Sequence, residues 1–158
     1  MIKLPTAFQV SDCVRRLTRR DATVTVLAKP ATAKLAFAGT FHSGDGLLVA
    51  MCAADLALAA YTGAALALIP ADSAQERVRS GALDEMMQEN FAEVLNVLSR
   101  IFVVPETTRM ALLEPIFPPR AVPEMLELGV PGTSILRADY AIDIGGYGVG
   151  HLALWGMA

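Results

Sequence analysis

The sequence has few of the residues on which enzymes commonly build a nucleophilic or metal-dependent active site. It contains only two histidines and two cysteines. His42 and His151 lack the spacing of metal ligands, and Cys13 and Cys52 form no CxxC motif. The nucleophile elbow, the zinc-protease motif, the P-loop and the dinucleotide-binding glycine motif are also missing. We therefore expect no metal site, no cofactor of the chain's own and no covalent catalysis.

Positive charge is also scarce. Thirteen Lys and Arg stand against sixteen Asp and Glu, for a net charge of −3, and such a balance does not suit a nucleic-acid partner. The basic residues cluster once, as Arg15, Arg16, Arg19 and Arg20. We interpret this cluster as the C-terminal end of a first helix, where cations complement the helix dipole, in preference to an anion or nucleic-acid site.

Long apolar runs are missing as well. The longest run, Leu56 to Ile69, is about 14 residues, shorter than the roughly 20 that span a bilayer. Residues 1–10 lack the apolar segment of a signal peptide. Each cysteine lies in an apolar run, which predicts buried free thiols and fits a reducing compartment. The sequence therefore predicts a cytoplasmic protein with no membrane partner.

Small apolar residues, by contrast, are abundant. The chain has 158 residues, of which 54% are apolar, 18% charged and 6% aromatic. This length suits a single domain over residues 1–158, and the composition favours a dense core over disorder. With few aromatic side chains, we expect helices to pack closely on a sheet.

The periodicity of the apolar residues predicts a mixed architecture. Helical spacing predicts a helix over 6–20, a second after Asp55 and a long third over 82–102. The sequence SAQE (73–76) has the spacing of a capping box at the start of a short turn. The predicted strands are 22–29, 34–41, 47–53, 109–114, 134–144 and 150–157. The first three are expected to form an antiparallel meander and the last two a closing hairpin. Because strands and helices are partly segregated, the predicted class is α+β, an antiparallel sheet with the long helices packed on one face.

The predicted helix over 82–102 carries a polar stripe. At about 100° per residue, five polar side chains fall within about 80° of one another: Glu85, Glu89, Glu93, Asn96 and Arg100. Apolar side chains occupy the opposite side of the helix. Like charges at i,i+4 cost a few tenths of a kcal/mol in an isolated helix, so a stripe selected only for stability would alternate in sign. By itself the stripe is compatible with a solvated face and with a functional surface.

The order of elements around this helix resembles a known family. A strand leads into a short helix over MCAADLALAAYTG (51–63), and after a spacer comes the series Glu89, Glu93 and Asn96. Strands and a closing hairpin follow. This arrangement resembles the CheC/CheX/FliY family of chemotaxis phosphatases, and the single copy of the motif and the length are most similar to CheX. The resemblance covers nearly the whole chain as topology and depends on one motif as residues.

The resemblance implies a function in two-component chemotaxis signalling. The implied activity is a phosphatase that removes the phosphoryl group from the aspartyl phosphate of a CheY-type response regulator. Glu93 and Asn96 are the implied catalytic residues: Asn96 would orient a water, because an amide both donates and accepts, and Glu93 would engage a lysine of the partner. Mg²⁺ is expected on the partner receiver domain. Because CheX-like proteins can dimerise through their sheets, we also expect a homodimer paired at an edge near the closing hairpin.

The chain departs from the family signature at two positions. Glu89 stands where the family has Asp or Ser, and Arg100 stands where it usually has Gly; we assign both to partner binding. Three interpretations remain open: an active phosphatase, a catalytically inactive CheX-like adaptor that binds a receiver domain or a flagellar switch component, and a structural domain with a solvated stripe. Arg100 is the feature that favours the adaptor.

Overall fold

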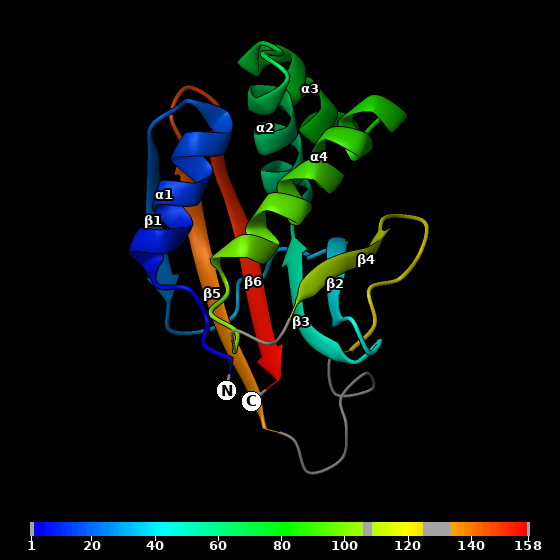
Figure 1. Cartoon of the computed structure of the whole chain (residues 1–158). Helices are drawn as coiled ribbons and strands as arrows, with labels where there is room; N and C mark the ends of the chain where they lie inside the picture. The colour runs from blue at the N-terminus through cyan, green and yellow to red at the C-terminus, as the bar shows by residue number, and fades with distance from the viewer. Residues whose placement is uncertain (1, 106–108, 125–133, 158) are drawn as a thin grey trace.

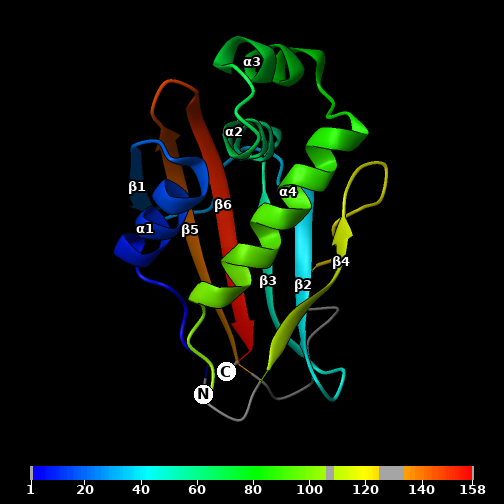
Figure 2. The same ribbon diagram turned by 45° about the horizontal axis from the view of Figure 1, so that its top comes forward.

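The computed structural model describes residues 2–105, 109–124 and 134–157, in which helices lie on one face of an antiparallel sheet (Figures 1 and 2). The helices are α1 (Ala7–Thr18), α2 (Leu56–Leu66), α3 (Ala71–Ser80) and α4 (Glu85–Leu98), and a 3₁₀ turn, η1 (Ser99–Ile101), follows α4. The strands are β1 (Ala22–Leu27), β2 (Phe37–Ser43), β3 (Leu48–Ala54), β4 (Met110–Ile116), β5 (Ile135–Ile144) and β6 (Gly148–Met157). The predicted α+β class is confirmed.

The strand order corrects two predictions. Within the described residues, six strands lie in the order β1-β5-β6-β3-β2-β4. The predicted meander is wrong, because β2 and β3 form a hairpin but β1 pairs with β5, Ala22 opposite Ile144. The closing hairpin of β5 and β6 therefore lies inside the sheet, and β1 and β4 are the edges. Apolar alternation shows which face a strand buries but does not show which strand lies beside it.

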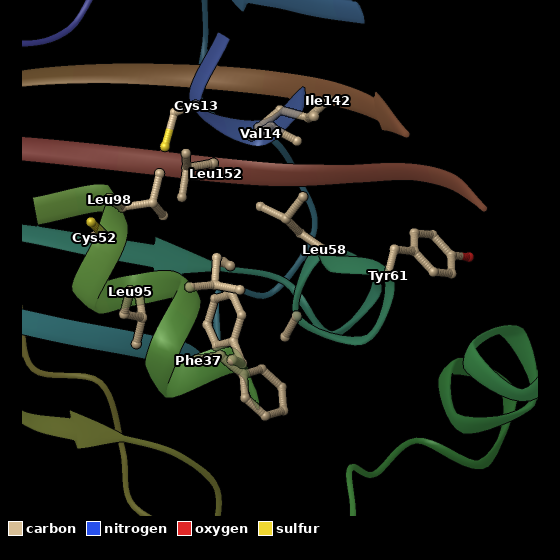
Figure 3. Close-up of a cluster of buried hydrophobic side chains, with 14 of the residues drawn as sticks. Cys13, Val14, Phe37, Cys52, Leu58, Tyr61, Leu95, Leu98, Ile142 and Leu152 are labelled. Carbon is tan, nitrogen blue, oxygen red and sulfur yellow. The ribbon is translucent and has the colours of Figure 1, made fainter. Parts of the chain in front are cut away.

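Small residues let α2 pack directly against the sheet. Ala59, Ala60 and Ala64 of this helix are fully buried, and Leu58 lies in the same apolar cluster as Ile142 and Leu152 (Figure 3). At Gly150 of β6, a Cβ atom would lie 2.5 Å from the Cα atom of Leu58. Only glycine fits a backbone approach this close, so this residue sets the distance between α2 and the sheet.

Helix starts follow local chemistry at three of four positions. The side chains of Thr6, Asp55 and Asp84 each accept a hydrogen bond from a backbone N–H in the first turn of α1, α2 and α4, as N-cap residues do. The predicted capping box at 73–76 is wrong, since α3 starts at Ala71 after Pro70 and has no side-chain cap. Proline tends to precede or open a helix because it lacks an N–H to donate.

The long helix is shorter than predicted. It starts after the Asp84 cap and keeps α-helical geometry only to Leu98, and the chain then tightens into η1. Arg100 therefore lies on the 3₁₀ turn and not on the α-helix. The segment before α1 is tied to the segment after η1, because Lys3 and Val103 exchange two backbone hydrogen bonds with N···O distances of 2.8 and 3.1 Å.

Candidate functional site

Helix α4 is held rigidly by its apolar face. Its fully or almost fully buried side chains are Met87, Phe91, Val94, Leu95 and Leu98. The Phe91 ring packs edge-to-face on Phe37 at a centroid distance of 6.3 Å, and in a tilted arrangement on Phe117 at 6.2 Å. Such aromatic pairs add to the stabilisation from area burial. The opposite face of α4 is thereby fixed in its orientation toward solvent.

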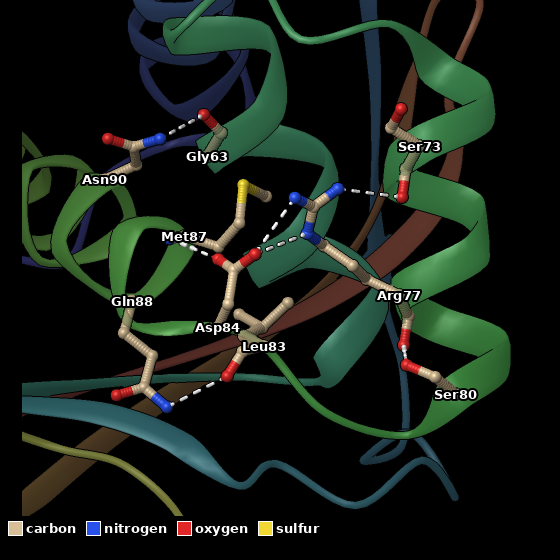
Figure 4. Close-up of polar contacts among 9 residues, drawn as sticks. All are labelled: Gly63, Ser73, Arg77, Ser80, Leu83, Asp84, Met87, Gln88 and Asn90. Carbon is tan, nitrogen blue, oxygen red and sulfur yellow. Dashed lines mark hydrogen bonds and ion pairs between the residues drawn. The ribbon is translucent and has the colours of Figure 1, made fainter.

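The N-terminus of α4 is fixed by a charged cap. Asp84 Oδ1 accepts a hydrogen bond from Met87 N at 2.9 Å, and its Oδ2 pairs with Arg77 Nη2 of α3 at 3.0 Å (Figure 4). The hydrogen bond from the Met87 N–H holds the pKa of the Asp84 carboxyl below its ordinary 3.8, and Arg77 adds to that effect. The cap therefore links α3 to α4 and fixes where the polar stripe begins.

The polar stripe lies where the helical spacing predicts. Glu85, Glu89 and Glu93 are exposed, and Asn96 is half-buried on the same face of α4. Residues three apart on a helix are neighbours, so Glu93 and Asn96 lie one turn apart. The structure thus brings the two predicted catalytic side chains together, while their roles stay predictions.

The amides of α4 differ in what they contact. Asn90 Nδ2 donates to Gly63 O of α2 at 3.2 Å, and Gln88 Nε2 donates to Leu83 O at 3.2 Å (Figure 4). The Asn96 side chain, in contrast, has no hydrogen-bond partner among the described residues; only its backbone carbonyl accepts, from Ser99 Oγ at 2.6 Å. Asn96 therefore presents both a free donor and a free acceptor to a ligand or a water.

Arg100 occupies a different setting from the rest of the stripe. It is exposed on η1 and lines a groove together with Phe8, Asp12 and Arg16 of α1. In the part of the chain that the structure describes, its guanidinium makes no ion pair. The interpretation of the basic cluster as the end of the first helix is confirmed for Arg15 and Arg16, which lie in the last turn of α1. They pair with Asp21 and Asp12 at 3.3 and 3.2 Å, respectively. The groove itself was not predicted, because it depends on how α1 and α4 meet.

A second polar cluster was also missed. Asp55 caps α2 by accepting from Leu58 N at 2.9 Å, and it also accepts from His151 N of β6 at 3.0 Å. His151 Nδ1 lies 2.8 Å from Asp55 Oδ2. The sequence signals Asp55 as a helix start but does not show its long-range partner. The cluster fastens α2 to β6, and it has a structural explanation without a ligand.

Within residues 2–105, 109–124 and 134–157, no three His, Cys, Asp or Glu side chains gather as a metal site requires. No helix of this described part is long and apolar enough to cross a membrane.

The site offers an unpaired amide beside a carboxylate on a rigid, solvent-facing helix. These two groups can position a water and a cation of a second molecule.

Comparison with solved structures identifies the fold. The chain is similar to FliM in a FliM–SpeE complex from H. pylori, with a TM-score of 0.66 and 10% identity over 96% of this chain and 81% of that one. It is similar to FliY from Thermotoga maritima, with a TM-score of 0.55 and 13% identity over 95% and 83%. CheX from Borrelia burgdorferi, in a complex with CheY, BeF3 and Mg²⁺, matches at 0.43 and 8% over 94% and 92%.

The FliM and FliY likenesses confirm the fold that the CheC/CheX/FliY resemblance predicted. Comparison with protein-family models and with curated proteins gave no match. At identities this low, the structural likeness establishes the fold alone.

Proposed function

We propose that the protein is a phosphatase of a CheY-type receiver domain and removes the phosphoryl group from its aspartyl phosphate. The observation that carries this proposal is the pair of Glu93 and Asn96. They lie one turn apart on the solvent-facing side of a helix whose other side is buried, and the Asn96 amide is unpaired among the described residues. Helix stability alone does not explain an unpaired, half-buried amide that follows a row of carboxylates of one sign.

In the proposed mechanism this chain supplies only a group that positions water and a group that binds the partner. An acyl phosphate is already reactive, and Mg²⁺ held by the partner would neutralise the charge that develops on the phosphoryl oxygens. Asn96 would hold a water in line with the phosphorus atom, donating from its Nδ2 and accepting at its Oδ1. Glu93 would pair with a lysine of the receiver and fix the register of the two proteins. Water then attacks phosphorus, the bond from phosphorus to the aspartyl oxygen breaks, and inorganic phosphate leaves.

The test follows loss of the phosphoryl group from a CheY-type receiver domain in the presence of Mg²⁺. We expect the wild-type chain to accelerate this loss. Asn96→Ala should reduce the acceleration by orders of magnitude, because no side chain then positions the water. Stability should change by less than about half a kcal/mol, as at most surface sites. Glu85→Ala, on the same face at the start of α4, is the matched control and should retain turnover. Equal turnover in wild type and Asn96→Ala would contradict the proposal.

A second candidate is an adaptor without turnover, which binds a receiver domain or a flagellar switch component. Arg100 favours it, because this long cation ends the stripe where the family usually has glycine. The adaptor predicts saturable binding of the receiver with no effect on its dephosphorylation rate. Restoring the family residue with Arg100→Gly separates the two candidates, since a gain of turnover at saturating receiver would show that Arg100 suppresses chemistry.

We also propose a homodimer, paired through strand β1 and not through the closing hairpin. The closing hairpin cannot pair with another chain, because both its strands are interior. Strand β1 is an edge whose Val26 side chain is 57% exposed, and an uncovered edge offers N–H and C=O groups to a second copy.

A further inference from the structure

A groove lies between α1 and the end of α4, next to the acidic stripe. Figures 1 and 2 show the C-terminal end of α4 beside α1 on the same face of the sheet. The groove has a volume of about 490 Å³, and its walls are the Phe8–Leu17 side of α1 and the segment 97–103. The backbone hydrogen bonds between Lys3 and Val103 hold the two walls together at one end. The groove is therefore preformed, as recognition sites commonly are.

The groove is apolar along its length. Phe8 on α1 is 76% exposed and Val103 on the facing wall is 46% exposed. Leu17, Val97 and Ile101 also line the groove and are half-buried. Single exposed apolar residues are normal on a protein surface, but a row of them along one groove marks an interaction site.

The rim of the groove is basic. Arg16 stands on α1, where it pairs with the groove-lining Asp12 at 3.2 Å, and Arg100 stands on η1. Cys13 lies in the wall of the groove, where burial raises the pKa of its thiol to about 11 and Asp12 adds to the rise. The guanidinium groups of Arg100 and Arg16 oppose this rise, so their positive charge is felt inside the groove. Arg15, Arg19 and Arg20 add positive charge along α1 and the turn after it. Asp21 pairs with Arg15 and offsets part of this charge. This end of a net-negative protein therefore attracts anions.

The charge changes sign along α4. Glu85, Glu89 and Glu93 make its first turns acidic, and Arg100 begins the basic region. Val97 and Arg100 continue from the last turn of α4 into the groove wall. A molecule that covers both areas must bring a basic group to Glu93 and acidic groups to the groove.

From the apolar floor, the basic rim and the change of sign, we infer that the groove binds an acidic amphipathic helix of the partner protein. Its apolar side chains, spaced i, i+3 or i+4 and i+7, fill the space between Phe8 and Val103, and its flanking carboxylates pair with Arg16 and Arg100. The inference relies on the proposed function only for the identity of the partner, as the protein that also meets the stripe.

The experiment uses the full chain and displayed 16-residue peptides. Selection should enrich sequences with apolar residues at helical spacing and Asp or Glu on the flanks. An enriched peptide, labelled with fluorescein, is then titrated by anisotropy at low and high salt. We expect the Arg16→Glu, Arg100→Glu double variant to bind at least about tenfold more weakly, and the affinity of wild type to fall with salt. Arg79→Glu, at an exposed arginine of α3, is the matched control and should bind like wild type. Thermal melts establish that each variant is folded.

Three results with the peptides would overturn the inference: no enrichment, enrichment of basic peptides, or equal binding by wild type and the double variant. It is also overturned in favour of a second copy if light scattering shows self-association that the double variant abolishes. Peptide binding needs no phosphoryl transfer, so it separates this inference from the proposed function. If no dephosphorylation occurs in any variant while the acidic peptide binds in the expected pattern, the groove assignment stands and the phosphatase fails.

Discussion

At the scale of single residues, the carboxylates of the stripe differ in what surrounds them. Glu85 lies in the first turn of α4, where an acid complements the helix dipole, and so its position has an explanation in stability. Glu93 lies beyond that turn, exposed, with Glu89 four residues before it. Like charges at this spacing destabilise a helix slightly. The charge of Glu93 therefore does not stabilise α4, and contact with a partner is the role that we test.

Glu93→Gln removes this charge while keeping the shape of the side chain. We expect the variant to bind a receiver domain carrying beryllofluoride in place of the phosphoryl group about 30-fold more weakly, because losing one member of an interfacial charge pair costs about 2 kcal/mol. The affinity is measured by titration calorimetry. Glu85→Gln removes a charge of the same type near the other end of the stripe and serves as control. A Glu93→Gln affinity equal to that of wild type would exclude this charge pair.

At the scale of elements, α2 and β6 are joined by one close approach. A methyl group at position 150 would lie 2.5 Å from backbone and side-chain atoms of Leu58. The Asp55 and His151 hydrogen bonds fasten the same helix to the same strand. Because a packed helix and an interior strand cannot both yield, the contact tolerates no added volume.

Gly150→Ala should therefore destabilise the fold strongly. We expect a loss of about 3 kcal/mol in the free energy of unfolding, at the upper end of the usual cost of overpacking. Urea denaturation followed by circular dichroism measures it. Gly44→Ala is the control, because nothing lies within 4 Å of the Cβ that it adds. Similar unfolding midpoints for the two variants would show that α2 shifts away from the sheet at little cost.

The cap of α4 gives a prediction for pH. The pKa of Asp84 lies below 3.8 in the folded chain, chiefly because of the Met87 N–H hydrogen bond. A carboxyl with a lowered folded pKa stabilises the fold above its unfolded pKa, and this contribution is lost as pH falls through the folded value. Asp84→Asn keeps a capping side chain without a titrating charge. We expect wild type to be more stable than Asp84→Asn at pH 7, with the difference shrinking below about pH 4. Thermal denaturation from pH 7 to pH 3 measures the gap; one that is constant over this range would show that the charge of Asp84 is irrelevant.

At the scale of the whole molecule, the sheet has two very different edges. Strand β4 contains Pro115, which cannot donate a hydrogen bond to a further strand. It also contains the charged Glu114, and Arg109 directly precedes it. Such residues protect an edge from pairing. Strand β1 carries Thr23, Thr25 and the exposed Val26 and has no proline. Of the two edges, β1 is the one suited to a second copy.

We expect a mass in solution of about twice the 16.8 kDa of one chain. Val26→Lys should convert the dimer to a monomer, because a lysine at an edge strand opposes pairing. The same change at exposed Ala111 of β4 is the control and should leave the dimer intact. Multi-angle light scattering measures both. A wild-type mass of one chain at high protein concentration would refute the homodimer.

By itself, the sequence determined what local patterns encode. The apolar face of α4 follows from helical spacing, and the start of α2 after Asp55 follows from capping chemistry. The end of α3 follows from Gly81, which adopts a positive φ of 84°. The closing hairpin and the stripe with Glu93 and Asn96 follow in the same way. The tertiary structure alone decided that β1 pairs with β5, that Asp55 holds His151, and that Arg100 shares a groove with α1. The physical reason is that periodicity acts over one or two turns, whereas strand order and helix contacts depend on side chains far apart in the chain, whose packing no local pattern records.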